Sequence, residues 1–209
     1  MSLVAADSGL LEPLRSFVKI ERKPTWGTCA GLILLAEAAN ATKQGGQELI
    51  GGLDVRVNRN HFGRQIESFQ ADLDLPFLPG STTRAPFPGV FIRAPIVEKL
   101  LAHVEGEQQA EKVVSGTIVA PSRAAKDAVA QKAMSSQVEI MGVLPGRLKK
   151  AAAAAAHGSQ LGAGEAVGDI IAVKQGNVFG TSFHPELTSD IRIHVWWLEQ
   201  VIKATALGR

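Results

Sequence analysis

The sequence has 209 residues, of which 45% are hydrophobic and 20% charged, and its formal net charge is +2. This length and hydrophobic content suit one well-buried domain, and the dispersed basic residues argue against a nucleic-acid-binding face. The apolar run 32–36 is interrupted by Glu37 and is far shorter than the roughly 20 residues that cross a bilayer, so we expect no membrane span.

Cys29 is the only cysteine of the chain, which excludes an internal disulfide. The first seven residues lack the charged start and the apolar core of a signal peptide. Together these features predict a reducing, cytoplasmic location.

The predicted elements begin with a helix over 8–18, where the leucines and Phe17 recur at helical spacing. Pro24 ends that pattern before a short strand at 25–26. A second helix is expected over 30–40, directly after Cys29.

Alternating or continuous apolar residues then predict four strands, at 53–57, 68–73, 89–92 and 112–119. Four prolines between 76 and 88 predict an extended loop before the third of these strands.

Residues 121–167 are dominated by Ala, Gly, Ser and Lys and include six consecutive alanines at 151–156. Few large side chains are available there to offset the entropy of ordering. We therefore expect a surface insertion, partly helical and partly disordered, within one domain that spans 1–209.

The C-terminal part of the chain predicts a hairpin and a helix. Two apolar runs, 170–173 and 178–183, flank a turn whose residues tolerate positive φ. An amphipathic helix is expected over 189–204, with Trp196, Trp197 and Val201 as packing residues.

The most informative motif places Cys29 at the centre of a G-x-C-x-G pattern, residues 27–31, between an apolar segment and a helical run. This is typical of a nucleophile elbow, a tight strand-to-helix turn that exposes a reactive side chain. A helix N-terminus beneath the sulfur is expected to lower the pKa of the thiol. The alternative is that Cys29 is a small buried hydrophobic residue.

The segment Phe183-His184-Pro185-Glu186-Leu187 strengthens the catalytic interpretation. A cysteine nucleophile needs a histidine that accepts and returns a proton, and a carboxylate that orients the imidazole. His184 and Glu186 supply both groups. The remaining histidines, at 61, 103, 157 and 194, show no ligand spacing, so we predict neither a metal site nor a cofactor.

Four motifs in the same order carry a resemblance to a known family. They are G-T-C-A-G-L at 27–32, R-N-H-F-G-R-Q at 59–65, G-V-F-I-R-A-P at 89–95 and F-H-P-E-L at 183–187. The chain resembles the PdxT/SNO glutaminase subunits of pyridoxal 5′-phosphate synthase. The likeness covers about 9–119 and resumes from about 169 to the end.

The resemblance implies an α/β fold of the class I glutamine amidotransferases, three layers with a largely parallel central sheet flanked by helices. It makes Cys29 the nucleophile and His184 with Glu186 its relay, and it implies that Arg59, Ile92 and Arg93 line the glutamine site. A guanidinium suits the α-carboxylate of a free amino acid, although without the family Arg93 would be read as a solvated ion-pair residue.

The implied function is hydrolysis of L-glutamine to L-glutamate and ammonia. The ammonia passes to a synthase subunit, within a hetero-oligomer, for the synthesis of pyridoxal 5′-phosphate (vitamin B6). The alternatives are a catalytically silent binding subunit, and a different amidotransferase or cysteine hydrolase on the same scaffold.

The sequence departs from the family's pattern at its N-terminus. Family members begin with a strand-helix-strand unit that ends in a G-G-E-S loop beside the glutamine, and neither of its motifs occurs in these 209 residues. We therefore expect an N-terminally truncated fold. The alternatives are a gene that encodes the missing strands upstream of Met1, a truncated isoform, and a variant that a partner completes; we favour the first because the chain starts at a methionine in mid-fold.

Overall fold

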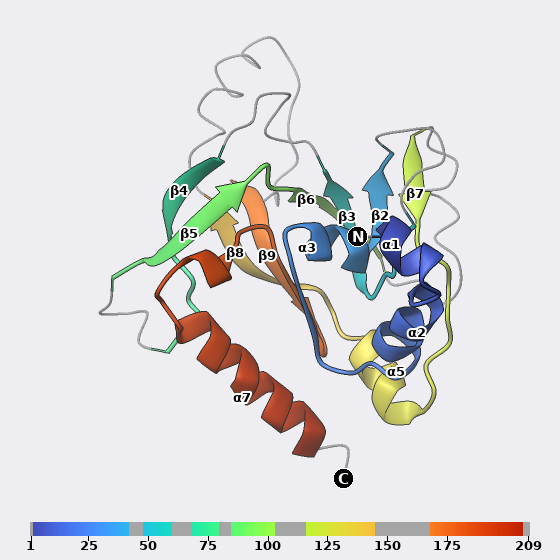
Figure 1. Cartoon of the computed structure of the whole chain (residues 1–209). Coiled ribbons are helices and arrows are strands. Elements are labelled where there is room, and N and C mark those ends of the chain that lie inside the picture. The colour runs from blue at the N-terminus through green and yellow to red at the C-terminus, as the bar shows by residue number, and fades with distance from the viewer. Residues whose placement is uncertain are drawn as a thin grey trace, which may run out of the picture.

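The computed structural model describes residues 2–41, 48–59, 68–79, 85–102, 116–144 and 168–206, which form a curled sheet with helices around it (Figure 1). The helical elements are α1 (Ser2–Asp7), α2 (Leu11–Arg15), the π-helical η1 (Ser16–Ile20), α3 (Ala30–Leu35), α5 (Ala128–Met134), the 3-10 turn η2 (Pro185–Leu187) and α7 (Arg192–Ala206). The strands are β1 (Thr25–Thr28), β2 (Ala36–Asn40), β3 (Leu53–Asn58), β4 (Ser68–Leu73), β5 (Phe87–Ile92), β6 (Ile96–Leu100), β7 (Thr117–Val119), β8 (Glu139–Leu144), β9 (Asp169–Gln175) and β10 (Val178–Thr181).

The main sheet has the strand order β1-β10-β9-β6-β3-β2-β7, with β8 also paired to β9, while β4 and β5 form a separate antiparallel pair. The α/β class predicted from the sequence is confirmed. The expectation of a largely parallel sheet is wrong for the described residues, where only β1 with β10 and β2 with β3 run parallel. The other described neighbours are antiparallel; β9 and β10, for example, are joined by a turn too short for a crossover.

The hairpin of β9 and β10 confirms the prediction made for this segment. Gln175 pairs with Val178, and Gly176 occupies the turn with φ of 55°. A Cβ at this position would lie 2.3 Å from the carbonyl oxygen of Ala133, so both backbone conformation and space require glycine.

The helix after Cys29 is shorter than predicted. It ends at Leu35, and the next five residues form β2, which lies between β3 and β7. Alanine and glutamate favour a helix by intrinsic propensity, but this segment is buried as a strand, and tertiary pairing overrides the local preference.

Within the predicted surface insertion at 121–167, the helical part is present as α5, but the expectation that this segment lies outside the main fold is wrong for β8. Asp127 caps α5 by accepting a hydrogen bond from Ala130 N–H at 2.8 Å, and β8 then pairs with β9 along the main sheet. This part of the chain therefore belongs to the fold because β9 offers it a hydrogen-bonding edge. Residues 145–167, which include the alanine run, and 112–115 of the predicted strand at 112–119 lie outside the described residues.

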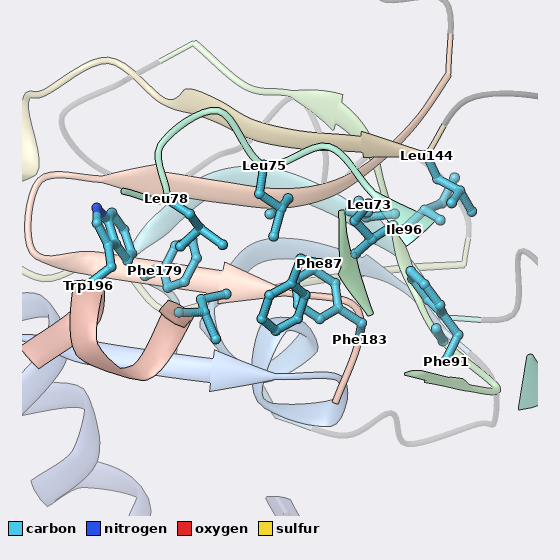
Figure 2. Close-up of a cluster of buried hydrophobic side chains, with 14 residues drawn as sticks. Leu73, Leu75, Leu78, Phe87, Phe91, Ile96, Leu144, Phe179, Phe183 and Trp196 are labelled. Carbon is cyan, nitrogen blue, oxygen red and sulfur yellow. The ribbon is translucent and has the colours of Figure 1, made fainter. Parts of the chain in front are cut away.

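Two large core clusters cover opposite faces of β10. Val178 belongs to the cluster with α2, η1 and α3, whereas its neighbour Phe179 belongs to the cluster shown in Figure 2. Trp196 of α7 lies in that second cluster, with its ring centroid 5.0 Å from that of Phe179, and Trp197 packs against the same cluster. The predicted packing roles of the two tryptophans are confirmed.

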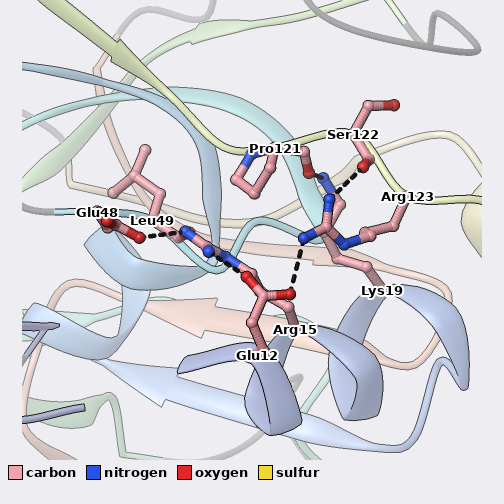
Figure 3. Close-up of polar contacts among 8 residues, drawn as sticks. All are labelled: Glu12, Arg15, Lys19, Glu48, Leu49, Pro121, Ser122 and Arg123. Atoms are coloured by element: carbon pink, nitrogen blue, oxygen red, sulfur yellow. Dashed lines mark hydrogen bonds and ion pairs between the residues drawn. The ribbon is translucent and has the colours of Figure 1, made fainter. Parts of the chain in front are cut away.

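Polar side chains of α2 bind the neighbouring loops (Figure 3). Arg15 donates to Glu12, to Glu48 and to the carbonyl oxygen of Leu49, and Arg123 donates to the second oxygen of Glu12 at 2.7 Å. Arg15 and Leu49 are buried, whereas Glu12 and Glu48 are largely exposed, so the contact with the Leu49 carbonyl oxygen is the one that is shielded from solvent.

A buried ion pair joins η1 to the sheet. Lys19 Nζ lies 2.8 Å from Glu37 Oε2, and both side chains are less than 10% exposed. Glu37 Oε1 accepts the backbone N–H of Gly52 at 2.7 Å, and Lys19 also donates to the carbonyl oxygen of Pro121. Burial raises the pKa of Glu37, and the charge of Lys19 opposes that rise.

Across the described ranges, no helix combines the length and the hydropathy that spanning a membrane requires.

Candidate active site

Cys29 occupies the sharp turn between β1 and α3 that the sequence predicts. Its backbone has φ of 48° and ψ of −104°, a conformation that residues other than glycine rarely adopt. Its N–H donates to the carbonyl oxygen of Thr181 at 2.7 Å, which ties the turn to the end of β10. The side chain is partly exposed, so the sulfur is neither a core group nor fully solvated.

The two glycines of the motif have different roles. A Cβ at Gly27 would lie 2.5 Å from the backbone carbon of Gly31 and 2.7 Å from Leu35 Cδ1, so its absence lets α3 fold back onto β1. A Cβ at Gly31 would meet nothing within 4 Å. The close packing of the elbow therefore requires glycine at position 27 but not at position 31.

Gly27→Ala is expected to destabilise the protein by about 1–3 kcal/mol, because the new methyl group meets backbone that cannot move without opening the turn. Thermal unfolding measures the effect, as a fall of roughly 2–4 °C per kcal/mol for a chain of this size. Gly31→Ala is the matched control, and we expect it to be neutral or slightly stabilising because it removes a glycine from a helix. Equal losses from the two variants would contradict this assignment.

His184 lies beside the elbow because β10 runs parallel to β1, with Thr181 paired to Thr28. The carboxyl ends of adjacent parallel strands lie at the same edge of a sheet, so Cys29 and His184 both follow that edge. Phe183 is fully buried, with its ring 5.8 Å from Phe87 and 5.9 Å from Phe91, and the N–H of His184 donates to the carbonyl oxygen of Val90 at 2.8 Å. These contacts fix the backbone from which the imidazole projects.

Glu186 completes the pair that the sequence predicts. Its Oε1 lies 2.7 Å from His184 Nδ1, within the 3-10 turn η2 and its N-cap. This contact leaves Nε2 as the nitrogen that is free for proton transfer, which is the arrangement required of a base oriented by a carboxylate.

The end of β5 brings Ile92 and Arg93 to the same place. The thiol of Cys29 lies 3.9 Å from the carbonyl oxygen of Ile92, within the reach of an S–H donor. Arg93 follows with φ of 47°, and its charge acts on the thiol of Cys29. Five of the six site residues predicted from the sequence thus lie together around the elbow: Cys29, Ile92, Arg93, His184 and Glu186.

The electrostatics of the thiol differ from the prediction. Burial is the largest influence and raises the pKa of Cys29; the nearby charge of Glu186 raises it further, while the N–H of Ala30 and the charge of Arg93 lower it. The expected net lowering by a helix N-terminus is wrong, because α3 has only six residues and the desolvation of the thiolate outweighs its contribution. The resting group is a thiol that must lose its proton to a base.

This raised pKa predicts the pH dependence of alkylation. Only the thiolate reacts with iodoacetamide, so the midpoint of the rate profile at Cys29 is expected above that of a free cysteine. Glu186→Gln removes a negative charge near the thiol and is expected to lower the midpoint, whereas Arg93→Ala removes a positive charge and is expected to raise it. Mass spectrometry of the Cys29 peptide gives the rates, and shifts of the opposite sign would contradict the electrostatic account.

Arg59 stands apart from this group. It directly follows β3, and β6 and β9 lie between β3 and β10 in the sheet. Its N–H donates to Asn40 Oδ1 at 2.8 Å, its side chain is largely buried, and that burial lowers the pKa of its guanidinium. A role for Arg59 toward the substrate stays a prediction.

Sequence reasoning missed two residues that hold the site. Thr181 accepts the N–H of Cys29 through its carbonyl oxygen, and Val90 accepts the N–H of His184 in the same way. A backbone carbonyl leaves no mark on the sequence, so only the strand pairing could have revealed these contacts.

An α/β sheet that carries a cysteine in a strained strand-to-helix turn, with a histidine-carboxylate pair on the neighbouring parallel strand, defines a protein of the cysteine nucleophile-elbow class. The sequence model of the SNO glutamine amidotransferase family matches residues 1–136 and 148–203. The chain belongs to this family.

Similar proteins carry consistent names. The chain is 39% identical over 201 residues to the "Probable pyridoxal 5'-phosphate synthase subunit PDX2" of Arabidopsis thaliana, covering 95% of this chain and 66% of that protein. It is 35% identical to the "Pyridoxal 5'-phosphate synthase subunit PdxT" of Streptomyces griseus subsp. griseus, covering 96% of this chain and 71% of that protein. A solved structure titled "Crystal structure of glutamine amidotransferase" matches with a TM-score of 0.57 and 28% identity, covering 96% of this chain and 72% of its own. The chain thus spans about two thirds of the length of these relatives.

Proposed function

We propose that this chain hydrolyses L-glutamine to L-glutamate and ammonia at Cys29, and that it delivers the ammonia to a synthase subunit that makes pyridoxal 5′-phosphate. The observation that carries the proposal is the His184 and Glu186 pair at 2.7 Å, placed on the strand beside a cysteine in an elbow turn. The family and the printed names of the relatives supply the substrate and the partner.

In the proposed reaction, His184 Nε2 removes the proton of the Cys29 thiol while the sulfur attacks the carbon of the side-chain carboxamide of glutamine. The C–N bond then breaks, and the imidazolium gives its proton to the departing nitrogen, which leaves as ammonia. Water, deprotonated by the same imidazole, hydrolyses the γ-glutamyl thioester to glutamate and restores the thiol. Glu186 stabilises the imidazolium that forms in each half of the cycle.

Backbone groups near the sulfur suit the charge that develops on the substrate. The N–H of Ala30 lies close enough to the thiol to lower its pKa, so it is placed to donate to the oxyanion of the tetrahedral intermediate. Arg93 offers a guanidinium for the α-carboxylate of glutamine, and the carbonyl oxygen of Ile92 offers an acceptor for an amino or amide group. We propose Arg59 as a second cationic side chain that binds glutamine.

The product ammonia needs an enclosed path from this chain to the synthase subunit. Ammonia released into neutral water becomes ammonium, which has no lone pair to attack a carbonyl carbon. We therefore propose a hetero-oligomer with the synthase, in a reducing, cytoplasmic compartment that keeps the single cysteine as a thiol.

Reconstitution tests the proposal. The purified chain is mixed with the synthase subunit and the synthase's other substrates, and receives glutamine whose side-chain amide carries heavy nitrogen, in the presence of unlabelled ammonium. We expect the label in the ring of pyridoxal 5′-phosphate and an equal amount of glutamate. If ammonium alone supports product, the silent-subunit alternative holds; if glutamate forms without any dependence on the synthase and the label never enters the ring, a different amidotransferase or hydrolase is indicated.

A further inference from the structure

Thr181, the last residue of β10, has a buried hydroxyl at a position where the surrounding core is apolar. It lies between Phe179 and Phe183, which both belong to the cluster of Figure 2, and as a strand residue it shares a face with Phe179. Thr181 itself is fully buried. A buried hydroxyl costs free energy unless it is hydrogen-bonded, and valine has nearly the same shape without that cost. The presence of threonine here therefore has to be explained by what its hydroxyl binds.

Two hydrogen bonds use the Thr181 hydroxyl. It accepts the indole N–H of Trp26 at 3.2 Å, and it donates to the carbonyl oxygen of Phe183, with the two oxygens 3.4 Å apart. Trp26 lies on β1, three residues before Cys29, and Phe183 directly precedes His184. The side chain of Thr181 thus joins the segment that carries the thiol to the segment that carries the imidazole.

The donor on β1 is itself held in place. The ring centroid of Trp26 lies 5.4 Å from that of Phe179 and 6.1 Å from that of Trp197. Phe179 is fully buried, and Trp197 packs against the same core cluster. Turning the indole toward another acceptor would disturb this packing, so Trp26 supplies a donor in a fixed position.

The backbone of Thr181 is fixed as well. Its carbonyl oxygen accepts the N–H of Cys29 at 2.7 Å, and the N–H of the next residue donates to the carbonyl oxygen of Ile171 at 2.8 Å. The peptide group between Phe183 and His184 accepts the hydroxyl of the same threonine. One residue therefore binds the backbone of the nucleophile through its carbonyl oxygen and the backbone of the base through its side chain.

We propose that Thr181 is a positioning residue for the reaction at Cys29, and that its hydroxyl, bonded to Trp26, sets the relation between the thiol and the imidazole of His184. This role rests on the proposed function. Proton transfer requires the sulfur and Nε2 to lie within hydrogen-bond reach, and a displacement of about 1 Å can cost on the order of 100-fold in rate. The hydroxyl touches neither the sulfur nor the imidazole, so its loss should affect turnover through geometry and leave glutamine binding nearly unchanged.

Steady-state kinetics of the complex with the synthase, with glutamine as the substrate, tests the effect on turnover. Thr181→Val removes both hydrogen bonds, and we expect kcat per folded molecule to fall roughly 10- to 100-fold while the KM for glutamine changes by less than about threefold. Thr181→Ser keeps the hydroxyl and is expected to retain most of kcat. Thr25→Val is the matched control, because it makes the same change at the other end of β1, where the hydroxyl donates to the carbonyl oxygen of Lys23. It should leave kcat unchanged.

Trp26→Phe tests the other partner of the hydroxyl. It removes the indole N–H but keeps an aromatic ring, and we expect it to lower kcat as Thr181→Val does. Because both variants break the same hydrogen bond, the double variant should lose less than the product of the two separate losses. A loss equal to that product would show that the two side chains act independently, and it would overturn the proposed link.

Amide hydrogen exchange tests the positioning without using the reaction. The N–H groups of Cys29 and His184 each donate to a backbone carbonyl oxygen, and we expect Thr181→Val to speed their exchange by about tenfold or more, whereas Thr181→Ser should not. The reference is the N–H of Ala120, which follows β7 at the opposite end of the main sheet and donates to the carbonyl oxygen of Glu37. A general loss of stability would speed exchange there as well, whereas a local loosening would not.

The two experiments separate a failure of this role from a failure of the proposed function. If the unaltered complex releases no glutamate, the proposed function fails, and the exchange rates still decide whether Thr181 holds the two segments. The role of Thr181 is overturned if Thr181→Val leaves exchange at Cys29 and His184 unchanged, or if exchange rises equally at Ala120. A kcat that Thr181→Ser does not restore, or an equal loss in Thr25→Val, would overturn it too.

Discussion

Replacing Cys29 by alanine is expected to abolish synthesis of pyridoxal 5′-phosphate from glutamine, with a loss in rate of about three orders of magnitude or more. The reason is that every covalent step of the proposed reaction passes through the sulfur, and no described residue beside His184 offers a second thiol. The measurement is the release of glutamate and the formation of product by the reconstituted complex. The fold should survive, because alanine fits the space of a partly exposed thiol.

The control lies within the same variant. Synthesis from ammonium does not use Cys29, so Cys29→Ala should support it as well as the unaltered chain does, provided that the partner still binds. A further pair separates proton transfer from packing: His184→Ala should lose glutaminase activity, whereas His194→Ala removes only a ring 5.3 Å from Trp26. If Cys29→Ala changed nothing and only ammonium were used, the silent-subunit alternative would stand.

Lys19→Met is expected to destabilise the protein by about 3–5 kcal/mol. The change leaves Glu37 buried without its cation, and it also removes the donor to the carbonyl oxygen of Pro121. Urea or thermal unfolding measures the loss. The chemistry at Cys29 should not change, so the activity per folded molecule serves as a second readout and is expected to stay the same.

Two further variants isolate the buried charge as the cause. Lys19→Met with Glu37→Gln removes the stranded carboxylate and keeps an acceptor for the N–H of Gly52, so the double variant should lose less stability than Lys19→Met alone. Lys23→Met removes a lysine from an exposed pair with Glu21 at 3.9 Å, and it should cost no more than about 1 kcal/mol. Similar losses from Lys19→Met and Lys23→Met would contradict a specific role for the buried pair.

The sequence predicted those elements whose local pattern and tertiary environment agree. Strands β3 and β4 and the β9–β10 hairpin have alternating or continuous apolar residues bounded by turn-forming residues, and all of them are present. The elbow was predictable because Gly27 supplies the small residue that its close packing requires, and His184 with Glu186 because their spacing suits one short turn.

The remaining features depend on partners that are distant in sequence. Residues 36–40 become a strand because β3 and β7 flank them, and Glu37 is tolerated there because Lys19 neutralises it from another element. Strand β8 has a largely apolar sequence, but it lies within a stretch dominated by Ala, Gly, Ser and Lys that obscured this pattern, and it pairs with the edge of β9. The anchoring carbonyl oxygens of Val90 and Thr181 follow from register alone.

The left-handed backbone of Cys29 places two demands in conflict at one residue. A φ of 48° costs a residue with a Cβ on the order of 1–3 kcal/mol, and glycine would escape most of that cost. Mutation to glycine would thus make the chain more stable while removing its only sulfur nucleophile. If thiol chemistry were not required, replacing Cys29 by glycine would relieve the backbone strain at this position. The fold by itself therefore favours glycine here, and only the chemistry of the sulfur favours cysteine.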